Sequence, residues 1–346
     1  MKTKRKSNFI KNFIVFALLI FLTFYILFKD QNVLDIFGIL KSVKLQFVIT
    51  AICCMFLYLV LEAVNLGRTL KNLNEKSSFW QNVKYAFIGF FFSSITPAAS
   101  GGQPMQVYYM YKDKISVANS TLALLINLTS MQIITIGFAL FSLMFNYQYL
   151  NRVLIICFII GIFLNSMALT LLIIGVYSKR LSKWLIEFAL KVLKFFRVKN
   201  LEAKKEKFEG ELARYQDSAV YIRNNRVLML KVLLTTLVQF TVYYSITYWT
   251  YRALGYSGHN IAEIITMQSV LFATVSGIPS PGAVGVSEGA FTEIFRNVYP
   301  KNVMGSAVLL NRGINFYLYV LICGIVTAIN HIKKKDIDGI DEEENV

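Results

Sequence analysis

The chain has 346 residues, of which 55% are apolar, and its 36 lysines and arginines outnumber its 20 acidic residues. Several runs of 16 to 27 mostly apolar residues exclude an ordinary water-soluble domain, because only a bilayer or a very large core would accommodate them. The four cysteines lie within apolar runs and the two histidines are far apart, which argues against a disulfide framework, a metal site and a histidine-based catalytic site. We therefore expect a membrane protein without a metal or other cofactor.

The first apolar run, 9–28, follows a basic N-terminus as in a signal peptide, but it is long and no small-x-small cleavage site follows it. We predict that it is an uncleaved first span. Further full spans are expected at 45–66, 119–145, 152–176, 227–250 and 304–330. The pattern predicts a single membrane domain over 1–346, an all-α polytopic protein with about six full spans.

Two further apolar segments, 83–107 and 263–297, are broken in the middle by "SITPAASGG" and "SGIPSPGAVG". Proline and glycine interrupt a helix, and irregular backbone at membrane depth needs protein or a water-filled cavity around it. We interpret each segment as a re-entrant hairpin that enters and leaves on one side. The alternative is a distorted ordinary span, and simple hydropathy would count seven or eight spans.

With two such hairpins, both termini lie on one face of the membrane, and that face receives 27 of the 36 lysines and arginines against 7 on the other. Cationic loops stay in the cytoplasm, so we expect cytoplasmic termini in the cell membrane. If either hairpin crossed completely, the loop 177–226 with its 13 cations or the basic N-terminus would lie outside. The charges therefore favour two hairpins of opposite orientation.

The loop 177–226 mixes apolar and basic residues. This composition fits an amphipathic helix on the anionic inner leaflet, and it equally fits a topology determinant with no other role. We do not expect nucleic-acid binding.

The order span, hairpin, span occurs twice, in 45–145 and in 227–330, with opposite orientations. Pro97 and Pro279 each lie 52 residues after the start of their unit. Oppositely oriented repeats with helices broken near the midplane are typical of alternating-access transporters. We therefore predict an inverted repeat.

Where a helix restarts after a break, its first N–H groups and the positive end of its dipole form a site for phosphate or carboxylate. Pro104 must lie in the first turn of such a helix, which favours a start at Gly101 or Gly102. In the second hairpin we expect Ser287 to cap the helix, with Glu288 in its first turn.

Arg312 lies about eight residues into the last span, where a cation costs roughly 2.5 to 3.5 kcal/mol on insertion scales. It pairs with Glu288 or contacts an anionic lipid head group, and both could apply to different states of one cycle. Glu62 and Asn65 lie near the cytoplasmic end of their span and are interpreted as unremarkable. The candidate substrate-binding residues are Thr96, Pro97, Gly101, Gly102, Gln103, Pro279, Pro281, Gly282, Gly285, Ser287, Glu288 and Arg312.

Weaker polar stripes occur on the predicted spans, where residues three or four apart share one helix face. Each stripe either lines a polar interior or makes ordinary hydrogen bonds between helices. The stripes are Thr235, Gln239 and Tyr243; Asn127 and Ser130; and Arg312, Asn315 and Tyr319.

The segments "TPAASGGQP", "GIPSPGAVGVSEGAFTEIF" and "LLNRGINFYLY" resemble three motifs of one family, the transmembrane region of the lysylphosphatidylglycerol synthases, also called multiple peptide resistance factors, and its stand-alone flippase-like relatives. Together with the span order, the resemblance covers almost the whole chain. It implies movement of an aminoacylated phospholipid to the outer leaflet. In fused members a C-terminal soluble domain makes that lipid from aminoacyl-tRNA.

The leading expectation is a flippase that moves an anionic or aminoacylated phospholipid, or a lipid-linked intermediate, between leaflets. The alternatives are a phosphatidylglycerol lysyltransferase, a component of lysyl-phosphatidylglycerol synthesis linked to cationic peptide resistance, or a non-transporting partner of a separate lipid-modifying enzyme. The chain ends at "HIKKKDIDGIDEEENV", which leaves no room for a soluble transferase and argues against the first alternative. Expected partners are membrane phospholipids, especially anionic ones, and the expectation also allows a separate enzyme or a homo-oligomer.

Overall fold

The computed structural model of the chain describes residues 38–39, 41–146, 152–177, 217–221, 224–276, 278 and 280–343. Every regular element within these ranges is helical. The predicted span 9–28, most of the loop 177–226 and Pro279 lie outside the described residues.

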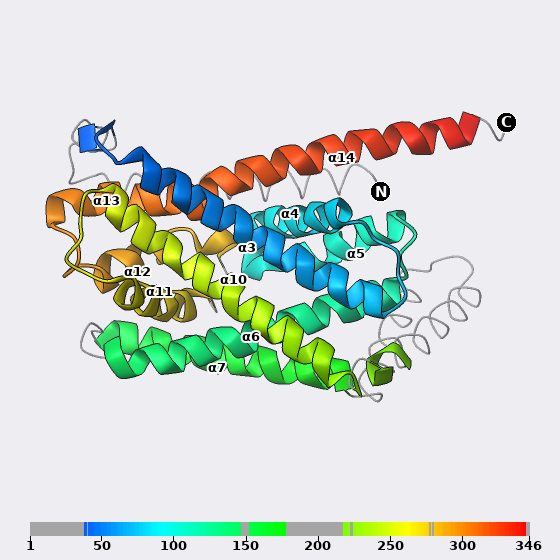
Figure 1. Cartoon of the computed structure of the whole chain (residues 1–346), viewed down its shortest axis with the longest axis horizontal. Helices are drawn as coiled ribbons and strands as arrows, with labels where there is room; N and C mark the ends of the chain where they lie inside the picture. The colour runs from blue at the N-terminus through cyan, green and yellow to red at the C-terminus, as the bar shows by residue number, and fades with distance from the viewer. Residues whose placement is uncertain are drawn as a thin grey trace.

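Within the described residues, five helical stretches are long and apolar enough to cross a membrane, and they correspond to five of the six predicted full spans. A helix of 28 residues is about 42 Å long, which exceeds the roughly 30 Å hydrocarbon core of a bilayer. The five stretches are α3 (Leu45–Asn72), α6 (Val117–Asn146), α7 (Arg152–Tyr177), α10 (Arg226–Ala253) and the stretch Lys301–His331. Helices α6, α7 and α14 (Leu318–Glu343) lie close to the long axis of the molecule, and α3 and α10 run obliquely to it (Figure 1).

The last of these stretches is not a uniform helix. It consists of α13 (Lys301–Arg312), a π-helical turn η4 (Gly313–Tyr317) and α14 (Leu318–Glu343). Single π turns occur frequently at functional sites, because they shift the side chains that follow relative to the α-helical phase. Here the π turn begins directly after Arg312.

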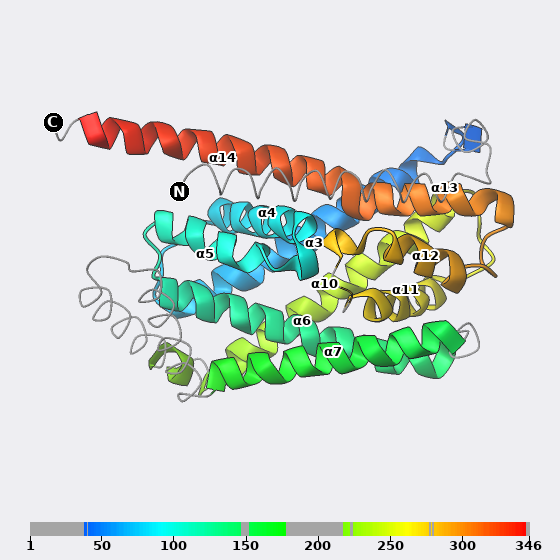
Figure 2. The ribbon, with the colours of Figure 1, turned by 180° about the vertical axis from the view of Figure 1, so that it is seen from behind.

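The two broken segments each form a helix, a short 3₁₀ turn and a second helix. The first comprises α4 (Phe79–Ile95), η1 (Pro97–Ala99) and α5 (Gly102–Lys112). The second comprises α11 (Ile261–Val275), η3 (Pro281–Ala283) and α12 (Val286–Ile294). Both views place α4 and α5 toward one end of the molecule and α11 and α12 toward the other, and the turns η1 and η3 contact each other between them (Figures 1 and 2).

The first helix of each broken segment begins with a capping box. Ser78 and Gln81 form a reciprocal capping box at the start of α4. Asn260 and Glu263 do so at the start of α11. Each box satisfies two backbone donors that a helix N-terminus leaves unpaired, so both helices have defined starting points.

The two 3₁₀ turns also share a backbone conformation. Each begins with a proline, Pro97 or Pro281, and the next residue has a positive φ angle, 51° at Ala98 and 58° at Gly282. In backbone conformation Pro281 therefore matches Pro97, whereas Pro279, which the sequence offset had matched with Pro97, lies outside the described residues.

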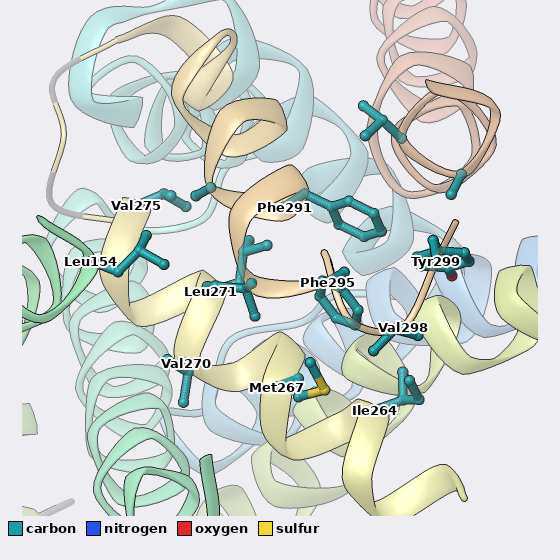
Figure 3. Packing of buried hydrophobic residues seen from close by; sticks show 14 of the residues in the cluster. Leu154, Ile264, Met267, Val270, Leu271, Val275, Phe291, Phe295, Val298 and Tyr299 are labelled. Atoms are coloured by element: carbon teal, nitrogen blue, oxygen red, sulfur yellow. The ribbon is translucent and has the colours of Figure 1, made fainter. Parts of the chain in front are cut away.

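Aromatic side chains fix the second broken segment in the core. The rings of Phe291 and Phe295 stack with centroids 4.5 Å apart, and Tyr299 joins the same cluster (Figure 3). Met267 and Leu271 of α11 pack against them, so α11 and α12 form one unit. Buried aromatic pairs of this kind stabilise by about 0.5–1.5 kcal/mol beyond the burial of their area.

Helix α7 lies at the edge of the bundle (Figure 1), and many of its apolar side chains are exposed. Val153, Ile156 and Phe163 are more than half exposed. An exposed apolar surface of this extent fits contact with lipid chains.

Candidate functional site

A cavity of about 260 Å³ lies where the two turns meet. Ala98 and Ala99 line it from the first turn, and Gly282 and Ala283 from the second. Arg312 is the one charged residue among the described residues that line it. The two broken segments therefore meet at a cavity that has a cation in its wall.

Arg312 and Glu288 form a buried ion pair beside this cavity. The Arg312 Nε atom donates to Glu288 Oε1 at 2.9 Å, and the two side chains are 8% and 0% exposed. A charge-assisted contact of this length is stronger than a neutral hydrogen bond, and removal of either partner would leave an uncompensated buried charge. The pairing alternative for Arg312 is thus present in this structure.

Further contacts fix the pair in place. Arg312 donates through Nη2 to the Gly282 carbonyl oxygen at 3.0 Å, and the Tyr317 hydroxyl donates to Glu288 Oε1 at 3.0 Å. The guanidinium carbon of Arg312 lies 4.3 Å from the centre of the Phe316 ring, a cation–π contact. The second turn, the π turn and α12 are therefore joined at one guanidinium group.

Gly282 is required at its position for two reasons. Its φ angle of 58° disfavours residues with a side chain, and an added Cβ atom would collide with the ring of Phe316. The same ring stacks on Arg312, so a side chain at position 282 would disturb the cation as well.

The helix after the second break starts differently from the prediction. Gly285, with a φ angle of 85°, is the N-cap residue of α12, so the predicted cap at Ser287 is wrong. Glu288 does lie in the first turn, where its Oε2 atom accepts the Gly285 N–H at 2.8 Å. A glycine adopts this positive φ without strain, and the glutamate then satisfies its N–H. Ser287 instead lines the smaller cavity.

The first turn has no charged residue and is held by one hydroxyl group. The Thr96 Oγ1 atom donates to the Phe92 carbonyl at 2.6 Å and accepts the Gly101 N–H at 2.9 Å. Gly101 is the N-cap residue and Gly102 begins α5, as the position of Pro104 had predicted. A Cβ atom at Gly102 would collide with the hydroxyl of Ser93, so this glycine permits close packing of α4 and α5.

A second cavity, of about 620 Å³, continues from the first. The two share part of their lining, including Tyr58, Phe90, Ser93 and Phe272. Gln103, one of the predicted site residues, lines this larger cavity, whereas Thr96 and Pro97 support the turn and line neither cavity. The prediction thus combined residues that face the space with residues that shape the backbone around it.

Glu62 was interpreted as unremarkable, and the structure corrects this. Its carboxylate lines the larger cavity and accepts a hydrogen bond from Gln106 Nε2 at 3.2 Å. The Asn65 side chain is also packed inside the protein, since it is 1% exposed and donates to Thr236 of α10 at 3.0 Å. One sequence signal pointed to Glu62: Tyr58, which also lines the cavity, lies one turn before it on the same helix face. The sequence did not reveal the hydrogen-bond partner Gln106, because it is 44 residues away.

The polar stripes divide between their two expected roles. Ser130 bonds to Thr236 across helices at 2.9 Å, which is ordinary interhelical hydrogen bonding. Tyr243 and Asn315 line the smaller cavity, and Asn127 lines the larger one. The Oδ1 atoms of Asn127 and Asn315 are buried without a hydrogen-bond partner.

The fold and the apolar helices define a multi-pass α-helical membrane protein. The chain belongs to the family described as lysylphosphatidylglycerol synthase TM region, whose sequence profile matches residues 9–323. It is also 24% identical over 317 residues to a UPF0104 membrane protein of Archaeoglobus fulgidus, which covers 90% of this chain and 94% of the relative. The resemblance inferred from the three motifs is therefore confirmed at the level of the family.

Proposed function

We propose that this protein moves a phospholipid between the leaflets of the cell membrane, with the head group passing through the cavities and the acyl chains remaining in lipid. The observation that carries the proposal is the buried Arg312–Glu288 pair at a cavity formed by two broken helices. An ionisable pair at membrane depth is costly and typically marks a substrate pathway. Family membership supports a lipid-related role, and the resemblance adds anionic and aminoacylated phospholipids as candidate cargo.

The lengths of the broken helices support re-entrant hairpins. The 17 residues of α4 and the 15 of α11 extend about 26 and 22 Å, which is less than the roughly 30 Å core. Their second helices, α5 and α12, are shorter still. Segments of these lengths enter and return more readily than they cross.

The arrangement of the two segments supports an inverted repeat. They share a capping box, a proline-initiated turn and a positive φ angle at the next residue, and they extend from opposite ends of the molecule toward the centre (Figure 2). Under this proposal α4 and α5 enter from the cytoplasm and α11 and α12 from the exterior, with both termini cytoplasmic. Rocking of one repeat against the other would open the central cavity to each side in turn.

The Arg312 guanidinium is the group that we propose to contact the phosphate of the lipid. In the present arrangement it is paired with Glu288, and its cavity also contains the unpartnered Asn315 Oδ1 and Ser280 Oγ atoms. A phosphate would compete with Glu288 for the fork of N–H donors. The ion pair would then represent the empty state of the cycle and head-group contact the loaded state.

A basic groove supports an anionic lipid as a partner on the cytoplasmic side. This groove of about 670 Å³ is lined by Arg68, Lys71 and Lys76, with Glu75 as its acidic member. Trp80 beside it is 71% exposed, and tryptophan is enriched at membrane interfaces. Each nearby cation contributes on the order of 1 kcal/mol of attraction to an anionic leaflet.

The test is a leaflet-resolved transport assay on reconstituted protein across a panel of phospholipid head groups. We expect the wild-type chain to accelerate movement of at least one anionic or aminoacylated phospholipid. Arg312→Ala is expected to abolish this movement while the protein still inserts, and Arg312→Lys to restore only part of it because the bidentate fork is lost.

The matched control is Arg296→Ala. Arg296 also faces a glutamate, Glu293 at 3.7 Å, but its side chain is 53% exposed. An exposed pair contributes little, so this variant is expected to transport as the wild type does. Folded wild-type protein that moves no phospholipid in the panel would contradict the proposed function.

A further inference from the structure

The two adjoining cavities are lined by ionisable side chains of opposite sign. Among the described residues that line each of them, Arg312 is the charged member of the smaller cavity and Glu62 of the larger. The shared wall of Tyr58, Phe90 and Phe272 joins them, so one molecule can extend from one into the other. The proposed function uses the cation of the smaller cavity and leaves the acid of the larger one without a role.

The larger cavity is rich in hydrogen-bond acceptors. The Glu62 carboxylate lines it, as do Asn127 and Gln132, whose Oδ1 and Oε1 atoms are buried without a partner. Asn127 is 4% exposed, so its unpaired oxygen lies well away from the protein surface. A buried acceptor without a donor is unfavourable, and a donor-rich ligand would satisfy the two amide oxygens and add donors to the Glu62 carboxylate.

Gln106 fixes the position of the acid. Its Nε2 atom donates both to Glu62 Oε1 and to the Tyr85 carbonyl oxygen at 3.2 Å, and the side chain is 2% exposed. Gly89 makes room for it, because a Cβ atom there would collide with the Gln106 amide. The carboxylate is therefore held at the cavity wall by α5 of the first broken segment.

We propose that the larger cavity is a subsite for a primary ammonium group, with Glu62 as its counter-ion and Asn127 and Gln132 as further acceptors. An ammonium group offers three donors and one positive charge, which match two amide oxygens and a carboxylate. The volume of about 620 Å³ lies within the range of small-molecule sites. Building on the proposed function, the cargo is a lipid whose head group places its phosphate at Arg312 and its ammonium group at Glu62.

The test measures lipid binding directly, by native mass spectrometry of detergent-solubilised protein with phosphatidylethanolamine and with phosphatidylglycerol. Both lipids carry a phosphate, but only the first carries an ammonium group. We expect Glu62→Gln to lower the preference for phosphatidylethanolamine by about tenfold, and Asn127→Leu to lower it by less. Glu293→Gln, in a side chain that is 50% exposed, is the control and is expected to leave the preference unchanged.

A second arm separates the head group from a free cation. Ethanolamine is expected to raise the melting temperature of the wild-type protein, compared with sodium at equal ionic strength, and to have no such effect on Glu62→Gln. An equal shift from sodium would overturn the assignment to an ammonium group. An unchanged lipid preference in both Glu62→Gln and Asn127→Leu would overturn it as well. If Glu62→Gln fails to fold, an unchanged preference in Asn127→Leu alone would overturn it.

The binding readout keeps the subsite distinct from the proposed function. If the protein moves no lipid but the preference depends on Glu62, the subsite stands and the transport proposal fails. If the protein moves lipids but its lipid preference does not change in Glu62→Gln, the transport proposal stands and the subsite fails.

Discussion

The two broken segments share a backbone conformation in their turns but differ in the side chains that stabilise those turns. Both turns begin with a proline followed by a residue of positive φ, yet the first is held by the neutral hydroxyl of Thr96 and the second by the Arg312–Glu288 pair. Irregular backbone at membrane depth needs internal partners in either case. The comparison teaches that the shape of the site comes from both halves, whereas the buried ion pair belongs to the second alone.

The largest expected effect comes from removing one member of the ion pair. Arg312→Ala or Glu288→Ala leaves the partner buried and uncompensated, which should destabilise the protein by about 3–5 kcal/mol. Thermal unfolding in detergent would measure this loss. The equivalent test of the first segment, Thr96→Val, should cost much less.

Exchanging the two residues separates structure from function. In the double variant Glu288→Arg with Arg312→Glu, the pair can form again and should recover part of the stability of the single variants. Recovered stability with absent transport would assign Arg312 to head-group contact. Recovery of both would instead favour a purely structural pair.

The next effect compares the two turns at equivalent positions. Gly282→Ala should destabilise by about 2–4 kcal/mol, because the residue has a positive φ and its Cβ atom would collide with Phe316. Ala98→Gly, the reverse change in the first turn, should alter stability by less than about 1 kcal/mol, since glycine relieves the strain at φ 51°. Equal losses in the two variants would contradict the equivalence of the turns.

A smaller effect is expected at the π turn. Tyr317→Phe removes the hydroxyl that donates to Glu288 Oε1, and a hydrogen bond to a charged group contributes about 1.5–3 kcal/mol. We expect a lower melting temperature without loss of insertion. An unchanged melting temperature would show that Arg312 and Gly285 alone satisfy the carboxylate.

Of the two hydrogen-bond deletions, the smaller loss of stability is predicted in the first turn. Thr96→Val keeps the shape of the side chain and leaves the Gly101 N–H without its acceptor, at a cost of about 1–2 kcal/mol. Thr241→Val is the matched control, because its exposed hydroxyl bonds to Leu237 of its own helix. A loss at Thr241 as large as that at Thr96 would argue against any special role of the first turn.

Local rules predicted much of this fold. Hydropathy predicted the five described spans, and the proline and glycine pattern predicted both breaks. The position of Pro104 predicted the start of α5. These features depend on residues close together in sequence. The cap at Ser287 failed because the sequence did not reveal that Gly285 has a positive φ, which lets it precede the helix.

Features that depend on distant contacts were not predictable in the same way. Gln106, on another helix, holds the Glu62 carboxylate at the cavity wall. Tyr317, the last residue of the π turn, donates its hydroxyl to Glu288 on α12. In a regular helix Tyr317 would not share a face with Arg312. The pair of Arg312 with Glu288 was one of two alternatives, since a cation within a span requires a partner without specifying which.

The central claim is that the two broken segments enter the membrane from opposite faces, and labelling from one side of the membrane tests it most directly. In a variant without the four native cysteines, Trp80→Cys and Ile261→Cys place one thiol each in the first turn of α4 and of α11, at side chains that are 71% and 40% exposed. A membrane-impermeant maleimide applied to intact cells should label position 261 at once and position 80 only after permeabilisation. Labelling of both positions from the same side would contradict the account.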